Sequence, residues 1–243
     1  MTFIYILGSG SKHDNDEIRY SIRSVVKHHP NARIVIVGEK PHWYGGEHHY
    51  VADESNCAYV NQWAKLEFAC SLADEFVYMD DDFYLLEPFE MSFYTPGKLI
   101  SKYKKVHALA GAWRDVVVAT YEQFGDVTGY LIHSPLPIKS DEFLQIAQRY
   151  PNRTVAPSLV PRQTYCINSN SYPTAPKDDI KFRGKFKSSV VKGEKFFSIA
   201  DRFFRQRDTI DSMYPNASQY EISKRLESDD KHEQTDIDYE IQS

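Results

Sequence analysis

The chain of 243 residues has few cysteines and no long apolar run, and each shortage excludes a class of protein. Its three cysteines, Cys57, Cys70 and Cys166, form no CxxC pair, so we expect no disulfide framework and a reducing compartment. The first apolar stretch, residues 3–7, lacks the basic flank of a signal peptide, and nothing later reaches the roughly 18 apolar residues of a membrane helix. The sequence therefore predicts a cytoplasmic protein without a membrane span.

Positive charge is not in excess either. The net charge is −5, so no overall field attracts duplex DNA or an acidic membrane. The chain contains no complete GxGxxG or P-loop motif, and so predicts neither a dinucleotide fold nor an NTPase. What it does contain is 42% hydrophobic residues, enough for the core of one domain over residues 1–227. Residues 228–243 are polar and acidic, as disordered tails are.

Apolar runs that alternate with helical patterns predict an α/β fold. Residues 3–7 and 34–38 resemble strands buried on both faces, and residues 18–26 between them repeat with a helical period. This order implies a right-handed crossover and a parallel sheet. Further on we expect a helix at residues 59–73, a strand at 76–79, a helix near 115–124, a strand at 128–133 and a helix at 141–150.

The most informative motif is the acidic triplet Asp80-Asp81-Asp82, directly after the strand at residues 76–79. In open α/β sheets, ligands bind beyond the carboxyl ends of the strands. Three carboxylates there repel one another, and a divalent cation removes that penalty. Hard oxygen ligands suit Mn²⁺ or Mg²⁺, which also bridge phosphate oxygens. The alternative is a solvated acidic turn.

Other motifs provide weaker candidates for a phosphate or nucleotide site. Gly8-Ser9-Gly10 stands between a strand and a helix, where backbone approaches an anion closely, although a plain tight turn is equally consistent with it. Asn61 and Lys65 lie one helical turn apart, and Arg19 shares a helical face with Arg23. Lys65 and Arg19 would reach a phosphate or, alternatively, be solvated surface residues.

His133 is expected at a strand end, just before Ser134-Pro135. An imidazole there would serve as a metal ligand or as a general base, since its pKa lies near neutrality. A lone histidine is more often structural, and no histidine pair of this chain has a trustworthy metal spacing.

Several blocks of the chain resemble the Stealth family, which comprises sugar-phosphate transferases of capsule synthesis and lysosomal-enzyme tagging. Residues 14–24 are closely similar to one conserved block of that family. The strand and acidic triplet, the His133-Ser134-Pro135 turn, and residues 197–201 and 214–221 resemble later blocks, in the same order.

The resemblance implies a glycosyltransferase-A fold, which is Rossmann-like, with a mostly parallel central sheet flanked by helices. It also implies a nucleotide-sugar donor, for which we expect a UDP-sugar, a divalent metal ion (Mn²⁺ or Mg²⁺) and a hydroxyl acceptor. Arg162 matches the arginine that follows the family's His-x-Pro turn and would clamp phosphate. Carried over by position, the other site candidates are Asp81, Asp82, His133, Asp201 and, more loosely, Asp179 and Lys181.

The chain also departs from the family. Its opening block is absent and Ala200 replaces an asparagine, so transfer of a sugar and transfer of a sugar phosphate both stay open. Glycosyltransferase-A spacing favours Asp80 and Asp82 as metal ligands, whereas the Stealth comparison favours Asp81 and Asp82. One alternative is transfer to a modified DNA base, held by residues 177–207, where ten Lys/Arg stand against four Asp/Glu. Another is a non-catalytic module that binds a nucleotide-sugar.

Overall fold

The structure is a computed structural model that describes residues 1–8, 15–104, 111–178, 180–199 and 203–222. Its centre is a five-stranded sheet in the order β3-β2-β1-β4-β7. The first four of these strands run parallel and β7 is antiparallel to β4. They are β1 (Thr2–Leu7), β2 (Arg33–Gly38), β3 (Glu47–His49), β4 (Glu75–Met79) and β7 (Leu136–Lys139).

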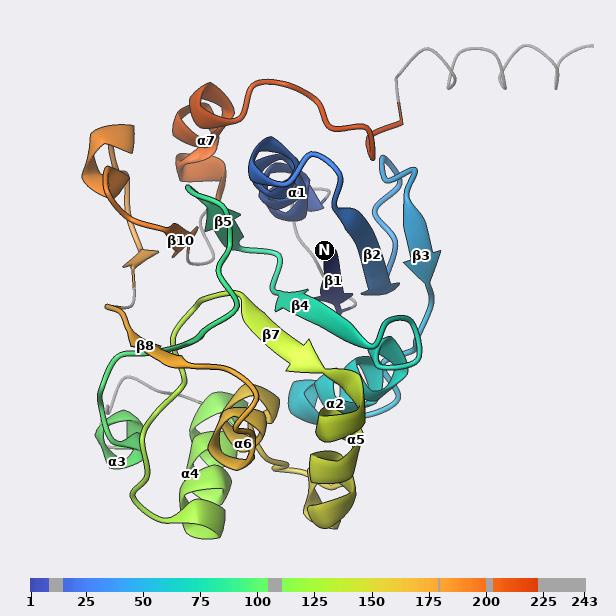
Figure 1. The fold of residues 1–243 in the computed structure, drawn as a ribbon, viewed down its shortest axis with the longest axis vertical. Helices are drawn as coiled ribbons and strands as arrows, with labels where there is room; N and C mark the ends of the chain where they lie inside the picture. The colour runs from blue at the N-terminus through green and yellow to red at the C-terminus, as the bar shows by residue number, and fades with distance from the viewer. Residues whose placement is uncertain (9–14, 105–110, 179, 200–202, 223–243) are drawn as a thin grey trace, which may run out of the picture.

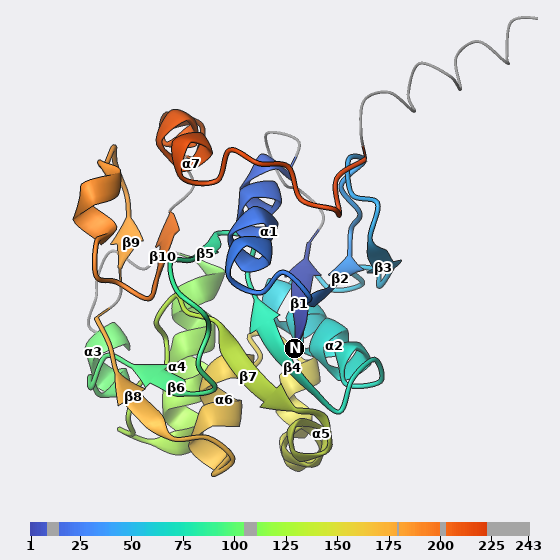
Figure 2. The ribbon, with the colours of Figure 1, turned by 45° about the horizontal axis from the view of Figure 1, so that its top comes forward.

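Helices cover both faces of this sheet, as Figures 1 and 2 show. The β1 side chains alternate between the faces because successive residues of a strand point in opposite directions. Phe3 and Tyr5 pack in the same cluster as Ile22 of helix α1 (Asp16–His28). Ile4 faces the other cluster, which includes Trp63 of α2 (Ala58–Ala69) and residues of α5 (Ser140–Arg149) and α6 (Pro161–Asn168). The mainly parallel α/β sheet expected from the apolar runs is thereby confirmed.

Smaller elements extend the sheet region toward the left of Figure 1. A three-stranded sheet has the order β5-β10-β9, and β6 pairs with β8. Because β5 follows the acidic triplet directly, this small sheet adjoins the triplet. The remaining elements are β5 (Phe83–Leu85), β6 (Phe93–Thr95), β8 (Thr174–Pro176), β9 (Lys181–Phe182), β10 (Phe196–Ile199), α3 (Ile100–Lys104), α4 (Ala112–Phe124), α7 (Arg207–Met213), and short 3₁₀ turns at Pro151–Thr154, Ser188–Val191 and Phe203–Arg205.

One expected strand is wrong. Residues 128–133 form only a single bridge, between Thr128 and Leu99, and the strand instead begins at Leu136. Strand β7 contains Pro137, which pairs with Val77 at the edge of the sheet. Proline lacks an N–H, so an edge strand is where a sheet tolerates it. The three cysteines are buried and free, and no helix in the described part of the chain is long and apolar enough to cross a membrane.

Candidate functional site

The acidic triplet lies at the point where the strand order reverses. Strand β1 has β2 on one side and β4 on the other, and the chain moves from one side to the other after β3. Tyr5 of β1 is in register with Met79 of β4, so Gly8 and Asp80 both follow the carboxyl ends of neighbouring parallel strands. Ligands of open α/β sheets bind at such a switch point. The fold therefore places the triplet at the expected ligand edge.

Asp80 is held by a chain of hydrogen bonds that starts on α2. Gln62 Nε2 donates to the Tyr78 hydroxyl at 2.6 Å, and that hydroxyl donates to Asp80. The fully buried ring of Tyr78 comes from strand β4, so the carboxylate is oriented by the core itself. Asp80 lines a small cavity of about 120 Å³ together with His133 and Arg162. The structure thus brings three of the predicted site residues to one place.

Asp82 and Asp81 have different surroundings. Asp82 Oδ2 accepts from Lys181 Nζ at 3.0 Å, and its side chain is 14% exposed. Burial raises the pKa of Asp82, while the charges of Lys181 and His133 oppose that rise. The pKa of Asp81 is raised to about 8, first by burial and then by the charges of Asp82, Glu17 and Asp80. Asp80 shares a cavity with His133, the charge of His133 acts on Asp82, and the charge of Glu17 in the first turn of α1 acts on Asp81.

Arg162 is buried beside the triplet, and its guanidinium already has partners within the chain. Nη1 donates to the Ser134 hydroxyl at 3.1 Å, and Nη2 donates to the Ser134 carbonyl. The guanidinium carbon lies 5.8 Å from the ring centre of Tyr78 and 5.7 Å from that of Phe83. These contacts fix its orientation and leave fewer N–H groups for a phosphate than an unpaired arginine would offer.

A second cavity, of about 470 Å³, contains three further predicted residues. Gly8, Asn61 and Lys65 line it, together with Asp53 and with Gln62, which also lines the Asp80 cavity. Lys65 is only 2% exposed, and its ammonium donates to the Leu7 carbonyl at 2.9 Å and to Asp53. The alternative of a solvated surface lysine is therefore wrong: Lys65 is buried at the wall of this cavity and pairs with Asp53.

Asn61 is also committed. Its amide accepts from the Ser55 N–H at 2.9 Å and donates to the Ser55 carbonyl at 2.7 Å, which fixes the segment before α2. Sequence reasoning missed Asp53, Gln62 and Tyr78. Asp53 lies in an irregular segment, where no spacing predicts a direction. The sequence did contain a signal for Tyr78. Side chains alternate along β4, so Tyr78 packs on the opposite face of the sheet from Val77 and Met79.

Arg19 lies elsewhere. Its guanidinium carbon is 4.7 Å from the ring centre of Trp43, and it pairs with Asp16 at 3.4 Å. Neither of the two cavities includes it among its lining residues. Helical spacing does place Arg19 beside Arg23, but both face Glu221 in the C-terminal segment. Ser9, Gly10, Asp179 and Asp201 lie outside the described residues, as does the acidic tail.

Four of the ten Lys/Arg of the basic stretch pair with carboxylates of the chain. Lys177 pairs with Glu194, Lys181 with Asp82, Lys195 with Glu90 and Arg207 with Asp16. In the part of the chain that the structure describes, no three His, Cys, Asp or Glu side chains are grouped as a metal site. The hydrogen bond from Tyr78 to Asp80 and the ion pair from Lys181 to Asp82 direct these two carboxylates to partners in the protein.

Comparisons with known proteins give structural neighbours only. No family model matches the chain, and curated proteins give no match. One similar solved structure is the galactosyltransferase LgtC in complex with donor and acceptor sugar analogues, at 12% identity and a TM-score of 0.45, covering 86% of this chain and 83% of that one. Another is the glycosyltransferase GlyE of Streptococcus pneumoniae TIGR4, at 10% identity and a TM-score of 0.39, covering 72% and 44%.

Proposed function

We propose that the protein is a glycosyltransferase-A-like enzyme that moves a sugar or a sugar phosphate from a nucleotide-sugar to a hydroxyl acceptor. The observation that carries the proposal is the convergence of Asp80, His133 and Arg162 on one cavity at the switch point of a parallel sheet. The neighbouring cavity at Gly8 provides room for the nucleotide of a UDP-sugar. The resemblance of residues 14–24 to the Stealth family supports the same class.

In this proposal the residues at the edge of the sheet divide the work. His133 accepts the proton of the acceptor hydroxyl, since it shares the cavity with Asp80. Arg162, fixed by Ser134, faces the diphosphate with its remaining N–H groups. Asp53, held by Lys65, accepts hydrogen bonds from the nucleoside, as acidic residues do from ribose hydroxyls in dinucleotide-binding folds. Lys65 then acts on the donor through Asp53.

The donor atoms at the triplet fit Mn²⁺ or Mg²⁺. Hard carboxylate oxygens are what these ions prefer, and the pKa values of Asp81 and Asp82 are raised first by burial, a cost to the charged carboxylates that a bound cation would reduce. Asp80 and Asp82 would hold the ion, because Asp80 shares the cavity of His133 and the charge of His133 acts on Asp82. A bound ion would neutralise the charge that develops on the departing phosphate.

Hydrolysis of UDP-sugars, measured with and without Mn²⁺, tests the proposal. Asp80→Asn should lower kcat at least a hundredfold, since the carboxylate at the centre of the site is lost. Asp74→Asn is the matched control, because Asp74 is exposed just before the amino end of the same strand. Equal activity of the two variants would remove Asp80 from the site, and the absence of hydrolysis with any donor would defeat the enzyme proposal.

The alternatives predict other results. A non-catalytic module would bind a UDP-sugar, seen as a thermal shift, without turnover. Transfer to a DNA base requires salt-sensitive DNA binding, which the internal ion pairs of Lys177, Lys181 and Lys195 do not favour.

A further inference from the structure

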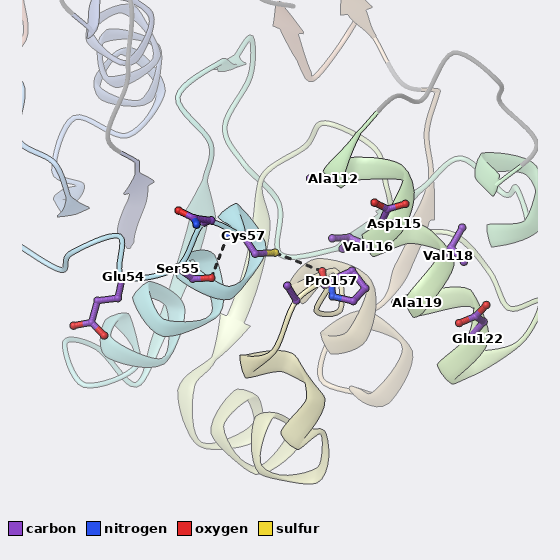
Figure 3. A pocket seen from close by; sticks show the side chains of 12 residues that line it. Glu54, Ser55, Cys57, Ala112, Asp115, Val116, Val118, Ala119, Glu122 and Pro157 are labelled. Atoms are coloured by element: carbon purple, nitrogen blue, oxygen red, sulfur yellow. Dashed lines mark hydrogen bonds between the residues drawn. The ribbon is translucent and has the colours of Figure 1, made fainter.

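A hollow beside the candidate site has no role in the proposal above. It has a volume of about 900 Å³, within the range of about 300–1,000 Å³ of small-molecule sites. Figure 3 shows it between the segment before α2, with Glu54 and Ser55, and helix α4, with Asp115 and Val116. We call it the α4 cavity.

The floor of the α4 cavity is apolar and held in place. Val116 and Cys57 are almost fully buried, and Ala119 and Pro157 complete the lining between them. The Cys57 thiol donates to the Pro157 carbonyl at 3.5 Å, and the Cys57 N–H donates to the Ser55 hydroxyl at 3.1 Å. The first bond joins the segment before α2 to Pro157 and the second lies within that segment, and both are drawn as dashed lines in Figure 3.

The rim of the α4 cavity is acidic. Glu54, Asp115 and Glu122 are exposed around it, and the twelve described residues that line it include no Lys, Arg or His. None of these three carboxylates makes an ion pair with another described residue. Ionised carboxylates only accept hydrogen bonds, so a ligand here must bring donors such as hydroxyl or ammonium groups. An anionic ligand would be repelled.

The α4 cavity adjoins both halves of the candidate site. It shares Ser55 and Asn56 with the cavity at Gly8. Trp113 follows Ala112 of its lining in α4 and stacks with Tyr59, with ring centres 5.7 Å apart, and these two rings line the cavity of Asp80 and His133. A molecule in the α4 cavity therefore lies beside the place where a donor would react.

We propose that the α4 cavity binds the acceptor and selects a glycan without acidic groups, either neutral or amine-bearing. A sugar ring has an apolar C–H face and a hydroxyl edge, which match the apolar floor and the carboxylate rim. This inference rests on the proposed transferase function and adds the class of acceptor to it.

Calorimetric titration of the full chain with three disaccharides tests the inference. We expect lactose and diglucosamine to bind, and a disaccharide that contains glucuronic acid to bind at least tenfold more weakly. Raising the salt concentration should weaken diglucosamine more than lactose, because only its ammonium groups interact with the rim through charge. Equal or tighter binding of the acidic disaccharide, or no binding of either non-acidic one, would overturn the inference. So would binding of a lysine-containing peptide in place of the sugars.

Variants locate the binding. Ala119→Trp fills the floor and should weaken both non-acidic sugars at least tenfold, with its fold checked by thermal melting. Asp115→Asn is the milder variant and should weaken diglucosamine more than lactose. Asp141→Asn is the matched control, since Asp141 is likewise exposed in the first turn of a helix, α5, and lies outside the cavity. Unchanged binding in Ala119→Trp would place the sugars elsewhere.

Donor hydrolysis by water, measured without any sugar, separates the two proposals. If the wild-type protein hydrolyses a UDP-sugar but binds none of the disaccharides, only the acceptor inference fails. If it neither binds nor hydrolyses any donor, the proposed function fails.

Discussion

Glu221 links the C-terminal segment of the described chain to helix α1 through hydrogen bonds with Arg23. Its carboxylate accepts two hydrogen bonds from Arg23, from Nε and Nη2, each at 2.8 Å. The Ser218 N–H donates to the same carboxylate at 2.7 Å. The side chains of Arg23 and Glu221 are only 11% and 10% exposed. We predict that Glu221→Gln destabilises the protein, because it leaves the Arg23 charge largely buried without its partner.

The size of this effect follows from burial. Removing one partner of a buried ion pair costs about 3–5 kcal/mol. Arg23 keeps its hydrogen bond to the Tyr214 carbonyl at 3.2 Å and a contact with Asp211 at 3.8 Å, so we expect the lower end, about 3 kcal/mol.

Arg33 and Glu47 provide the comparison, since they form the same two-pronged pair at 2.8 and 2.6 Å. Their side chains are 43% and 35% exposed, and an exposed pair contributes about 0–1 kcal/mol. Urea unfolding at pH 7 measures both Glu→Gln variants in the same assay. If Glu221→Gln costs no more than Glu47→Gln, burial does not decide the strength of these pairs and the reasoning is refuted.

The same pair predicts a pH dependence. Burial would raise the pKa of Glu221, but the hydrogen bonds from Arg23 and Ser218 outweigh it and the pKa is lowered. A group whose pKa is depressed by folding contributes stability above its unfolded pKa, which is about 4.3 for Glu. The difference in the free energy of unfolding between the wild-type protein and Glu221→Gln should therefore be largest at pH 7 and should shrink as the pH falls below about 4.

Three further predictions concern the candidate site. Lys65→Met should lower the free energy of unfolding in urea by about 1–3 kcal/mol, because the Leu7 carbonyl and Asp53 lose a buried hydrogen-bond donor. It should also raise the KM for the nucleotide-sugar more than it lowers kcat. An unchanged KM would exclude Asp53 from binding the nucleotide-sugar. Folding raises the pKa of Asp81, so the stability that this carboxyl contributes in EDTA is lost as the pH rises from about 4 to 8. Asp81→Asn should therefore raise the Tm more at pH 8 than at pH 5. The opposite order would contradict the raised pKa. Lys181→Gln should strengthen Mn²⁺ binding severalfold in calorimetry, because the Lys181 ammonium of the wild-type protein competes with the ion for Asp82. Weaker binding in the variant would argue that Lys181 does not compete with the ion.

The main elements of the fold follow from local patterns. Continuous apolar runs predicted β1, β2 and β4, and helical periodicity predicted α1, α2, α4 and α5, because strands buried on both faces and helices buried on one face leave these signatures. The run Tyr130-Leu131-Ile132 misled the same reasoning. Leu131 and Ile132 are buried from an irregular segment and line the Asp80 cavity, so apolar burial there arises without a strand.

For the site, the acidic triplet at the end of an apolar strand was visible in the sequence, since both signals are local. Its partners were not. Lys181 reaches Asp82 across 99 positions, and Arg162 reaches Ser134 across 28. Pairing over such separations depends on how the sheets and helices pack, and no local period encodes it.

The sequence by itself therefore determined a mostly parallel α/β sheet and three carboxylates at its ligand edge. Only the tertiary structure decided that Asp80 shares a cavity with His133 and Arg162, that the Lys65 ammonium pairs with Asp53, and that α4 lines an acidic cavity beside the candidate site. The physical reason is that local patterns determine where a side chain stands on its own element, whereas its charge partner and the walls around it come from elements distant in the chain.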